Sequence, residues 1–387
     1  MLDQQRAVLS TPRVRPLVGA SLLGRLPIGM AGLGIILLLR ADGRSYALAG
    51  LVDGAYAVGV GLVQPLLGRA IDRLGPRGVL GPLIGAFVIA CAALAQAGAH
   101  RAPAALLVPL GLAMGATMPP LGPAMRALWP ALVPGELRGA AYSLEAVTQE
   151  LSFILGPPVV AGLAVALSPR DAVLALGIFA AAGTGAFLAI VPAGARRAHV
   201  PGARALASAN ARILLAVTVL LGASFGAVEV AMPAFAEHHG SRSAAGLLLA
   251  MLALGSAIGG IAFAGGTSTA NAQRRLAVGL ALCGVLVAPL YLAGSVVAMA
   301  ALILVAGLPI APTFAAQYVL LDAFAVRGAA TETFAWNSTA IFLGASLGMA
   351  LGGSLIALGG YRASVALALG AALASALLAR LRVRGLS

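Results

Sequence analysis

Four ionisable side chains lie inside long apolar stretches of this sequence, where such groups are rare: Glu229, Glu150, Glu145 and Arg25. A charged group at the centre of a lipid bilayer costs about 2.5–3.5 kcal/mol on insertion scales, so each one present needs a reason. A buried carboxyl group can bind and release a proton, whereas an arginine keeps its charge and requires a carboxylate, an anionic ligand or water. These residue types indicate the handling of protons or charged molecules in an apolar setting.

We predict proton coupling at Glu229 and Glu150. Glu229 lies roughly 26 Å along its segment from the cytoplasmic end, if the segment is helical. Arg25 lies roughly 12 Å from the same end of its own segment, and we expect it to contact substrate or to exchange ion-pair partners. Two other interpretations fit the sequence as well: a neutral Glu229 hydrogen-bonded to a neighbouring helix, and an Arg25 whose guanidinium reaches the headgroups.

The composition requires a bilayer as the solvent. Of 387 residues, 60% are hydrophobic and 10% are charged, whereas soluble proteins carry about 25% charged residues. The net charge of +13 does not indicate nucleic acid as a partner, because the basic residues are all arginines in short clusters between apolar runs, without interleaved aromatic residues. We therefore expect the lipid bilayer, and no nucleic acid, as a partner.

A membrane-spanning helix needs roughly 20 predominantly apolar residues. Twelve such segments begin near Leu17, Ala47, Val79, Ala104, Gly139, Asp171, Arg212, Ala244, Leu276, Ala298, Gly328 and Arg362. A polar stretch separates two sets of six, which predicts an N-terminal bundle over 1–193, a cytoplasmic linker over 194–211 and a C-terminal bundle over 212–387. The predicted fold class is an all-α integral membrane protein.

The arginines between the segments predict the orientation. When both termini are placed on one side, that side receives eighteen arginines and the other side six. Because loops rich in arginine remain in the cytoplasm, we predict cytoplasmic termini and a multi-pass protein of the cell's inner (plasma) membrane. An odd number of spans would scramble this bias, so the distribution favours twelve.

The two sets of six segments also repeat each other. A shift of 189 residues places Pro120 on Pro309, and a shift of 196 residues places Gly59 on Gly255. Weak internal symmetry of this kind marks the two halves of many transporters, whose substrate site lies at the interface of the repeats.

A charged island between the second and third segments carries a recognisable motif, formed by Gly68, Asp72, Arg73, Gly75 and Arg77. It resembles the signature loop between helices 2 and 3 of the major facilitator superfamily, although Pro76 stands where a basic residue is usual. The resemblance implies twelve helices in two pseudo-symmetric six-helix bundles.

The same resemblance implies a cytoplasmic gate. The loop aspartate of the family faces the start of helix 11, here near Gly328, and a basic residue near the end of helix 4, here Arg126. A carboxylate at the positive end of a helix dipole and beside an arginine fork is physically favourable. We expect Asp72, Arg126 and Glu145 to form one network with the loop residues and to latch the cytoplasmic faces in an outward-open state. The alternative is a solvated turn that serves as a topology signal.

Two further groups follow from the family pattern. Gly156 and Pro157 match the Gly-Pro core of a helix 5 motif of drug/proton antiporters, but the double glycine expected shortly afterwards is absent. Helices 1, 4, 7 and 10 line the central cavity of the resembled fold, which would place Arg25 and Glu229 on facing walls. The expected substrate-cavity residues are Arg25, Gln317, Tyr318, Trp336 and Asn337. The polar members of this group could equally connect neighbouring helices.

Several functions are disfavoured. The chain has no lysine, so no Walker-type phosphate loop can form and ATP-driven transport by this chain alone is excluded. Neither a nucleophile elbow nor paired catalytic carboxylates indicate an enzyme, and we expect no cofactor. The four histidines fall in predicted loops, and we predict no metal site.

The sequence favours a secondary active transporter that works by alternating access, opening to the two sides of the membrane in turn. We expect proton-coupled efflux of a small hydrophobic or amphipathic molecule by a monomer. Two alternatives remain open: proton-coupled uptake of a sugar or an organic anion, with Arg25 as the partner of the anion, and a membrane receptor that kept the fold without transport.

Overall fold

The computed structural model describes residues 2–191, 203–240, 244–263 and 269–382. Within these ranges every regular element is a helix, so the predicted all-α class is confirmed for them. Part of the predicted linker over 194–211 lies outside the described residues. Its described part contains a 3₁₀ helix, η2 (Ala205–Ala207), directly before α9 begins at Ala209.

The elements follow one another in chain order. The first half contains α1 (Leu2–Ser10), α2 (Val14–Ala41), α3 (Tyr46–Leu74), α4 (Pro76–Ala99), α5 (Ala104–Thr117), α6 (Leu121–Leu132), η1 (Gly135–Leu137), α7 (Arg138–Ala166) and α8 (Pro169–Ile190). After η2, the second half contains α9 (Ala209–His238), α10 (Ala244–Ala262), α11 (Thr269–Val285), η3 (Ala288–Leu292), α12 (Val296–Gly307), α13 (Ile310–Phe324) and α14 (Ala330–Arg382).

The predicted number of membrane spans agrees with the structure. Eleven helical stretches in the described chain are long and apolar enough to cross a membrane. The last of these, α14, has 53 residues and is interrupted at Gly359 and Gly360, where φ of Gly360 is 66°. Positive φ is adopted readily by glycine, so the chain can turn there and α14 contributes two spans. The total is the twelve expected.

The internal repeat also appears in the structure. Helix α6 starts directly after Pro120 and α13 directly after Pro309, so the fourth span of each half is broken at a matching proline. A methyl group added to Gly59 would meet the backbone of α5, and one added to Gly255 would meet the backbone of α12. Both halves therefore use a glycine at the same helix crossing, which permits close packing of the two backbones.

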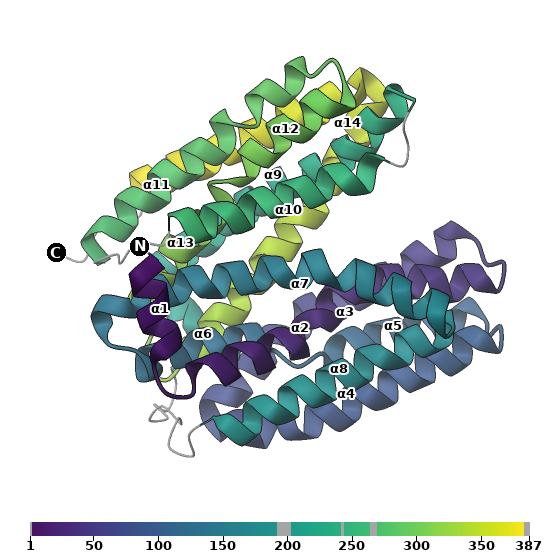
Figure 1. Cartoon of the computed structure of the whole chain (residues 1–387), viewed down its shortest axis with the longest axis horizontal. Helices are drawn as coiled ribbons and strands as arrows, with labels where there is room; N and C mark the ends of the chain where they lie inside the picture. The colour runs from purple at the N-terminus through teal and green to yellow at the C-terminus, as the bar shows by residue number, and fades with distance from the viewer. Residues whose placement is uncertain (1, 192–202, 241–243, 264–268, 383–387) are drawn as a thin grey trace.

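The helices form two bundles that meet at one end of the molecule and diverge toward the other (Figure 1). We call the end that carries α1 the terminal end and the opposite end the distal end. One buried apolar cluster contains residues of both bundles, among them Ile71, Tyr142, Val217 and Phe334. The buried members of two further clusters fall within residues 26–180 and 227–368, respectively. The bundles thus share a core near the terminal end and have separate cores toward the distal end.

Four helix pairs connect the bundles. Helices α3 and α6 pack against α14, and α7 packs against α10 and α13. A hydrogen bond from the Thr339 hydroxyl to the Gly61 carbonyl oxygen, 2.7 Å long, joins α14 to α3. These contacts place the first half of α14 and one side of α7 at the bundle interface, where the polar groups described below are found.

The crossing of α2 and α8 generates the first testable prediction. A methyl group on Gly183 of α8 would overlap the backbone of Gly24, whereas a methyl group on Gly185 would enter open space. Gly183→Ala is therefore expected to destabilise the protein by about 1–3 kcal/mol through overpacking. Gly185→Ala is the matched control and should leave stability unchanged or slightly improved. Thermal melting of the detergent-solubilised variants measures the difference, and equal melting temperatures would contradict this packing.

Candidate functional site

Asp72 binds the N-terminus of α14 across the bundle interface. Its two carboxylate oxygens accept hydrogen bonds from the backbone N–H groups of Thr331 and Glu332, at 3.0 and 2.9 Å. These N–H groups belong to the first turn of a helix, where they lack partners within the helix and the helix dipole is positive. The contact expected between the loop aspartate and the start of helix 11 is present, although it lies a few residues beyond Gly328.

The glycines of the motif explain why the loop can approach α14. A methyl group on Gly68 would lie 2.8 Å from the Thr331 carbonyl oxygen and 2.9 Å from the Ala335 side chain, so a larger residue would separate α3 from α14. Gly75 has φ 80°, which allows the chain to leave α3 and enter α4 directly. Gly68 therefore permits the interface, and Gly75 permits the turn.

The motif arginines have different partners. Arg77 donates to the carbonyl oxygens of Leu188 and Val191, at 3.3–3.4 Å, and so binds the end of α8 within its own bundle. Arg73 is exposed. The hydrogen bonds of Arg77 therefore stabilise the first bundle and do not join it to the second.

A different arginine of this loop bridges the bundles. Arg69 forms two hydrogen bonds with Glu332, one from Nε to Oε2 at 3.1 Å and one from Nη2 to Oε1 at 2.6 Å. The Glu332 side chain is 1% exposed and the Arg69 side chain 33% exposed. Such a fork is among the stronger ion pairs in proteins because both contacts are charge-assisted. Asp72, Arg69 and the first turn of α14 together form what we call the latch.

A second polar cluster lies deeper in the molecule. Arg25 of α2 donates through Nη2 to Oε1 of Glu145 on α7, at 2.7 Å, and the two side chains are 0% and 2% exposed. Arg126 of α6 approaches the same carboxylate oxygen through Nε at 3.3 Å. We call Arg25, Arg126 and Glu145 the basic centre, because two guanidinium groups share one carboxylate there.

Arg126 also connects the two bundles. It donates through Nη1 to the Ser338 hydroxyl of α14 and through Nη2 to Oε1 of Gln149 on α7, each at 3.3 Å. Its guanidinium lies 4.5 Å from the centre of the Tyr318 ring on α13. A cation over an aromatic face is attracted by the ring quadrupole. Three helices of the first half and two of the second therefore meet at this arginine.

Two expected pairings are corrected by this geometry. Arg126 and Glu145 were expected beside Asp72; they pair with each other as expected, but the third partner is Arg25 of α2, which binds the same Glu145 oxygen, and not Asp72. Arg25 was expected opposite Glu229, but it is fully buried against Glu145 of its own half. A buried guanidinium needs a compensating anion at contact distance, and α7 supplies it.

The two predicted proton-coupling residues lie on opposite sides of the bundle interface. Glu150 is half-buried on α7, and Ser256 of α10 lies beside its carboxyl group. Glu229 is exposed on α9 of the second bundle. Glu150 therefore faces the opposite bundle, which sequence reasoning could not establish.

The predicted cavity amides lie inside the second bundle. The Gln317 amide Nε2 donates to Asn337 Oδ1 at 2.7 Å and also contacts the Thr218 hydroxyl, which itself donates to Asn337 Oδ1 at 3.0 Å. All three side chains are buried, so they connect α9, α13 and α14. This is the interhelical role that the sequence left as an alternative for Gln317 and Asn337.

Of the two aromatic residues predicted for the cavity, Tyr318 lies at the basic centre. Tyr318 packs against Tyr142 and Phe334, each with its ring centroid 6.1 Å away. Trp336 is half-buried, and its indole Nε1 has no hydrogen-bond partner among the described residues. Tyr142 also donates its hydroxyl to the Arg126 carbonyl oxygen at 3.4 Å. The basic centre is thus bordered by aromatic rings from both bundles.

The Gly-Pro motif of α7 serves a packing contact. A methyl group on Gly156 would lie 2.5–2.9 Å from the backbone of Gly29 on α2, and Pro157 follows within the helix. The close approach of α7 to α2 brings the turns that carry Glu145 and Arg25 within contact distance. The motif therefore positions the basic centre indirectly.

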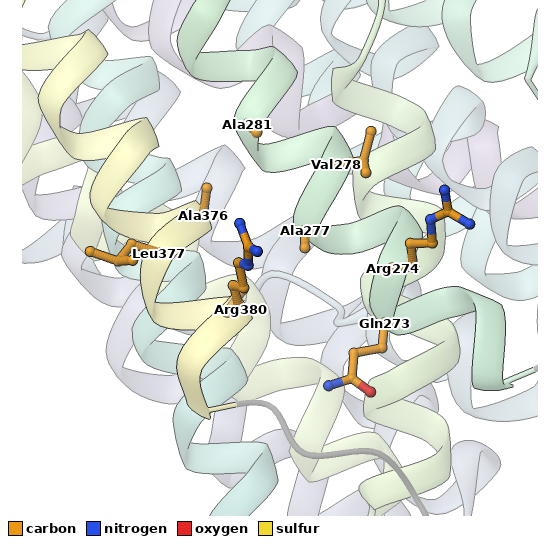
Figure 2. A pocket seen from close by; sticks show the side chains of 9 residues that line it. Gln273, Arg274, Ala277, Val278, Ala281, Ala376, Leu377 and Arg380 are labelled. Atoms are coloured by element: carbon orange, nitrogen blue, oxygen red, sulfur yellow. The ribbon is translucent and has the colours of Figure 1, made fainter.

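A separate cavity of about 690 Å³ lies between α11 and the end of α14 (Figure 2). Arg380 reaches into the space between the two helices, beside Ala277 and Ala376, while Arg274 extends to the other side of α11 (Figure 2). This cavity includes none of the residues predicted as site residues. No group of three or more histidine, cysteine or acidic residues in the described ranges could hold a metal ion.

Some site residues carried no distinctive sequence signal. Ser338 and Thr218 are ordinary hydroxyl residues in apolar helices, and their partners are distant in sequence. Arg69 and Glu332 were both visible as charged residues, but nothing in the sequence indicated that they pair across 263 positions. A contact of that kind is established by tertiary packing.

Known proteins share this architecture. The family model described as Major Facilitator Superfamily matches residues 17–340. The structure of the human organic anion transporter MFSD10 (TETRAN) is similar, with a TM-score of 0.76, 18% identity and coverage of 95% of this chain and 99% of that chain. No curated protein matches the sequence.

Two bacterial structures resemble this chain about as closely as the MFSD10 structure does. A bacterial homologue of the iron transporter ferroportin, in an outward-facing state, has a TM-score of 0.75 and 16% identity, covering 95% of this chain and 98% of that chain. The E. coli fucose:proton symporter FucP has a TM-score of 0.74 and 14% identity, covering 96% of this chain and 98% of that chain. At these identities the likeness establishes the fold.

The latch generates the second testable prediction. Asp72→Asn keeps the size of the side chain but leaves a single acceptor oxygen, so one of the two backbone hydrogen bonds is lost and the other loses its charge; a hydrogen bond to a charged group is worth about 1.5–3 kcal/mol. We expect the terminal end to open about tenfold more often. The reporter is Ala335→Cys, a buried position beside Gly68, in a background with Cys91→Ser and Cys283→Ser. Maleimide labelling of this cysteine should accelerate accordingly.

The control for this measurement is Asp171→Asn. Asp171 lies in the first turn of α8 and receives a hydrogen bond from Ser168 within its own bundle. Its substitution should leave labelling of the reporter unchanged. Equal labelling rates in Asp72→Asn and in the parent would show that Asp72 does not hold the bundles together.

Proposed function

This chain belongs to the Major Facilitator Superfamily, and from that premise we propose that it is a secondary active transporter that works by alternating access. The observation that carries the proposal is that the two bundles contact each other closely at one end of the molecule and not at the other. Polar latch contacts and a shared apolar core lie near the terminal end, and the cores are separate toward the distal end. Alternating access requires such an interface, which can open on one side while the other closes.

The proposed conformation is outward-open, with the terminal end in the cytoplasm of the cell and the membrane its inner (plasma) membrane. The arginine-rich loops support this orientation, since they fall on the side of both termini. Two of the similar structures, the ferroportin homologue and FucP, were solved in outward conformations. Opening the latch and closing the distal end would convert this state into its inward-open counterpart.

Proton coupling is proposed at Glu150 and Glu229. Glu150 lies near Ser256 of the opposite bundle and Glu229 is exposed on α9, so the surroundings of both would change when the bundles rock against each other. A carboxyl group that alternates between a watery and a dry environment binds a proton in one state and releases it in the other.

The substrate and direction are proposed from chemistry. Aromatic rings around the basic centre fit the apolar part of an amphipathic molecule, which supports efflux of such compounds. A specific observation favours the second candidate, uptake of an organic anion, because two arginines share one carboxylate in the same place. MFSD10, a similar structure, is described as an organic anion transporter, and FucP as a fucose:proton symporter.

A receptor that kept the fold is the remaining alternative. Its latch and coupling residues would then be dispensable, because no cycle of opening and closing would be needed. The ion pair of Arg69 with the buried Glu332 joins the two bundles and must break when they separate there, which favours a transporter. Transport by purified protein decides between the two.

Proteoliposomes that contain a pH-sensitive dye test the proposal. With a panel of amphipathic compounds and a pH gradient of either sign, we expect at least one compound to move protons across the membrane. Glu150→Gln and Glu229→Gln should each abolish this substrate-induced proton movement, because a neutral amide cannot carry the proton. Antiport and symport are distinguished by whether protons move against the compound or with it.

The matched control is Glu136→Gln, a substitution of an exposed glutamate between α6 and α7. Its proton movement should equal that of the parent protein. Full proton coupling in both Glu150→Gln and Glu229→Gln would remove these residues from the mechanism, and the absence of transport by every compound would favour a receptor.

A further inference from the structure

The basic centre holds more positive than negative charge. Arg25 and Arg126 both contact Oε1 of Glu145, at 2.7 and 3.3 Å, and the three side chains are at most 4% exposed. Arginine does not lose its proton in proteins, so one guanidinium charge remains uncompensated by this carboxylate. Uncompensated charge in a dry environment is unfavourable and attracts an anion.

The other acidic side chains of this region do not supply the missing charge. Glu150, the second acidic residue on α7, lies near Ser256 of α10. Asp72 binds the start of α14, and Glu332 pairs with Arg69. In the described part of the chain, neither Arg25 nor Arg126 forms an ion pair with any of these three residues. The excess of one positive charge is therefore a property of the centre.

The centre also has donors available for a ligand. Nε and Nη1 of Arg25 are buried and have no hydrogen-bond partner among the described residues. A buried donor without a partner is costly, and a ligand that accepts its hydrogen bond removes the cost. Of the three nitrogens of the Arg25 guanidinium, Nη2 therefore donates to Glu145, and Nε and Nη1 can still donate to a ligand.

The walls of the centre indicate what kind of anion would fit. The Tyr318 ring lies under the Arg126 guanidinium at 4.5 Å, and Tyr142 and Phe334 pack around Tyr318. Planar guanidinium groups match a carboxylate through paired hydrogen bonds, while aromatic rings match an apolar body. An inorganic anion would bind the guanidinium groups but would make no use of the aromatic rings.

We propose that the basic centre is the binding site for a small organic anion, a carboxylate with an apolar body, and that this anion is the transported substrate. The claim that the anion is transported depends on the proposed function, whereas the claim that it binds does not. Glu145 acts in this site as the internal counter-ion, because it occupies the arginines when the substrate is absent. The substrate carboxylate supplies the second negative charge that Arg25 and Arg126 require.

Ligand-dependent melting of the detergent-purified protein tests the binding site. The probes are benzoate, 4-phenylbutyrate and octanoate, each compared with its neutral amide and its ammonium analogue. We expect at least one carboxylate to raise the melting temperature while its amide and ammonium counterparts do not. Equal effects of the three charge types, or no effect of any carboxylate at millimolar concentration, would overturn the proposal.

Variants locate the effect at the centre. Arg126→Gln leaves the neutral pair of Arg25 and Glu145, so the protein should fold but bind the carboxylate at least about tenfold more weakly. Glu145→Gln removes the internal counter-ion, so it should melt at a lower temperature without ligand and bind the carboxylate about tenfold more tightly. Arg274→Gln, which removes an arginine at the separate cavity, is the control and should bind as the parent does.

The outcomes distinguish the two proposals. If Arg126→Gln and Arg274→Gln lose the same affinity, or neither loses any, the basic centre is not the site. Carboxylate-specific stabilisation without any flux in proteoliposomes would overturn the transporter proposal and keep the anion site. Proton-coupled flux of a neutral or cationic compound, without carboxylate binding, would overturn the anion site and keep the transporter.

Discussion

The compensation of charge between apolar helices is the constraint on which this structure depends. A membrane-spanning helix cannot hydrate an ionised side chain, so its partner must come from another helix. Arg25 of α2 finds Glu145 of α7, Arg69 of α3 finds Glu332 of α14, and Asp72 finds the backbone of α14. Each contact couples two spans, and those to α14 couple the two bundles.

The location of these contacts gives the molecule its asymmetry. The latch and the shared apolar core lie near the terminal end, whereas the bundles have separate cores toward the distal end. Opposite charges attract and a carboxylate is attracted to the N-terminus of a helix, so the electrostatics favour joining of the bundles at the terminal end. Protonation or ligand binding at the interface can change that balance by a few kcal/mol, which is the range needed to shift populations between two states.

Glycine and proline determine how closely the charged groups can approach. Gly68 lets α3 reach α14, and Gly156 lets α7 reach α2, so the latch and the basic centre both depend on a missing side chain nearby. Pro120 and Pro309 break the fourth span of each half at matching positions. The break just before α6 sets the direction of the helix that carries Arg126 into the bundle interface. Packing and electrostatics are therefore not independent in this fold.

The sequence alone determined the number of spans, the two halves, the all-α class and the motif at Asp72, because hydropathy, loop charge and local spacing are properties of neighbouring residues. It also identified Arg25, Glu145, Glu150 and Glu229 as the unusual charges. It could not determine which charge pairs with which. Arg126 and Glu145 were expected together with Asp72, but Arg25 is their third partner, and Gln317 was expected in a cavity and lies inside a bundle. Those outcomes depend on helix rotation and crossing, and a turn of about 100° per residue moves a side chain from one neighbour to another. Only the tertiary structure fixes that rotation, through backbone contacts among residues more than a hundred positions apart.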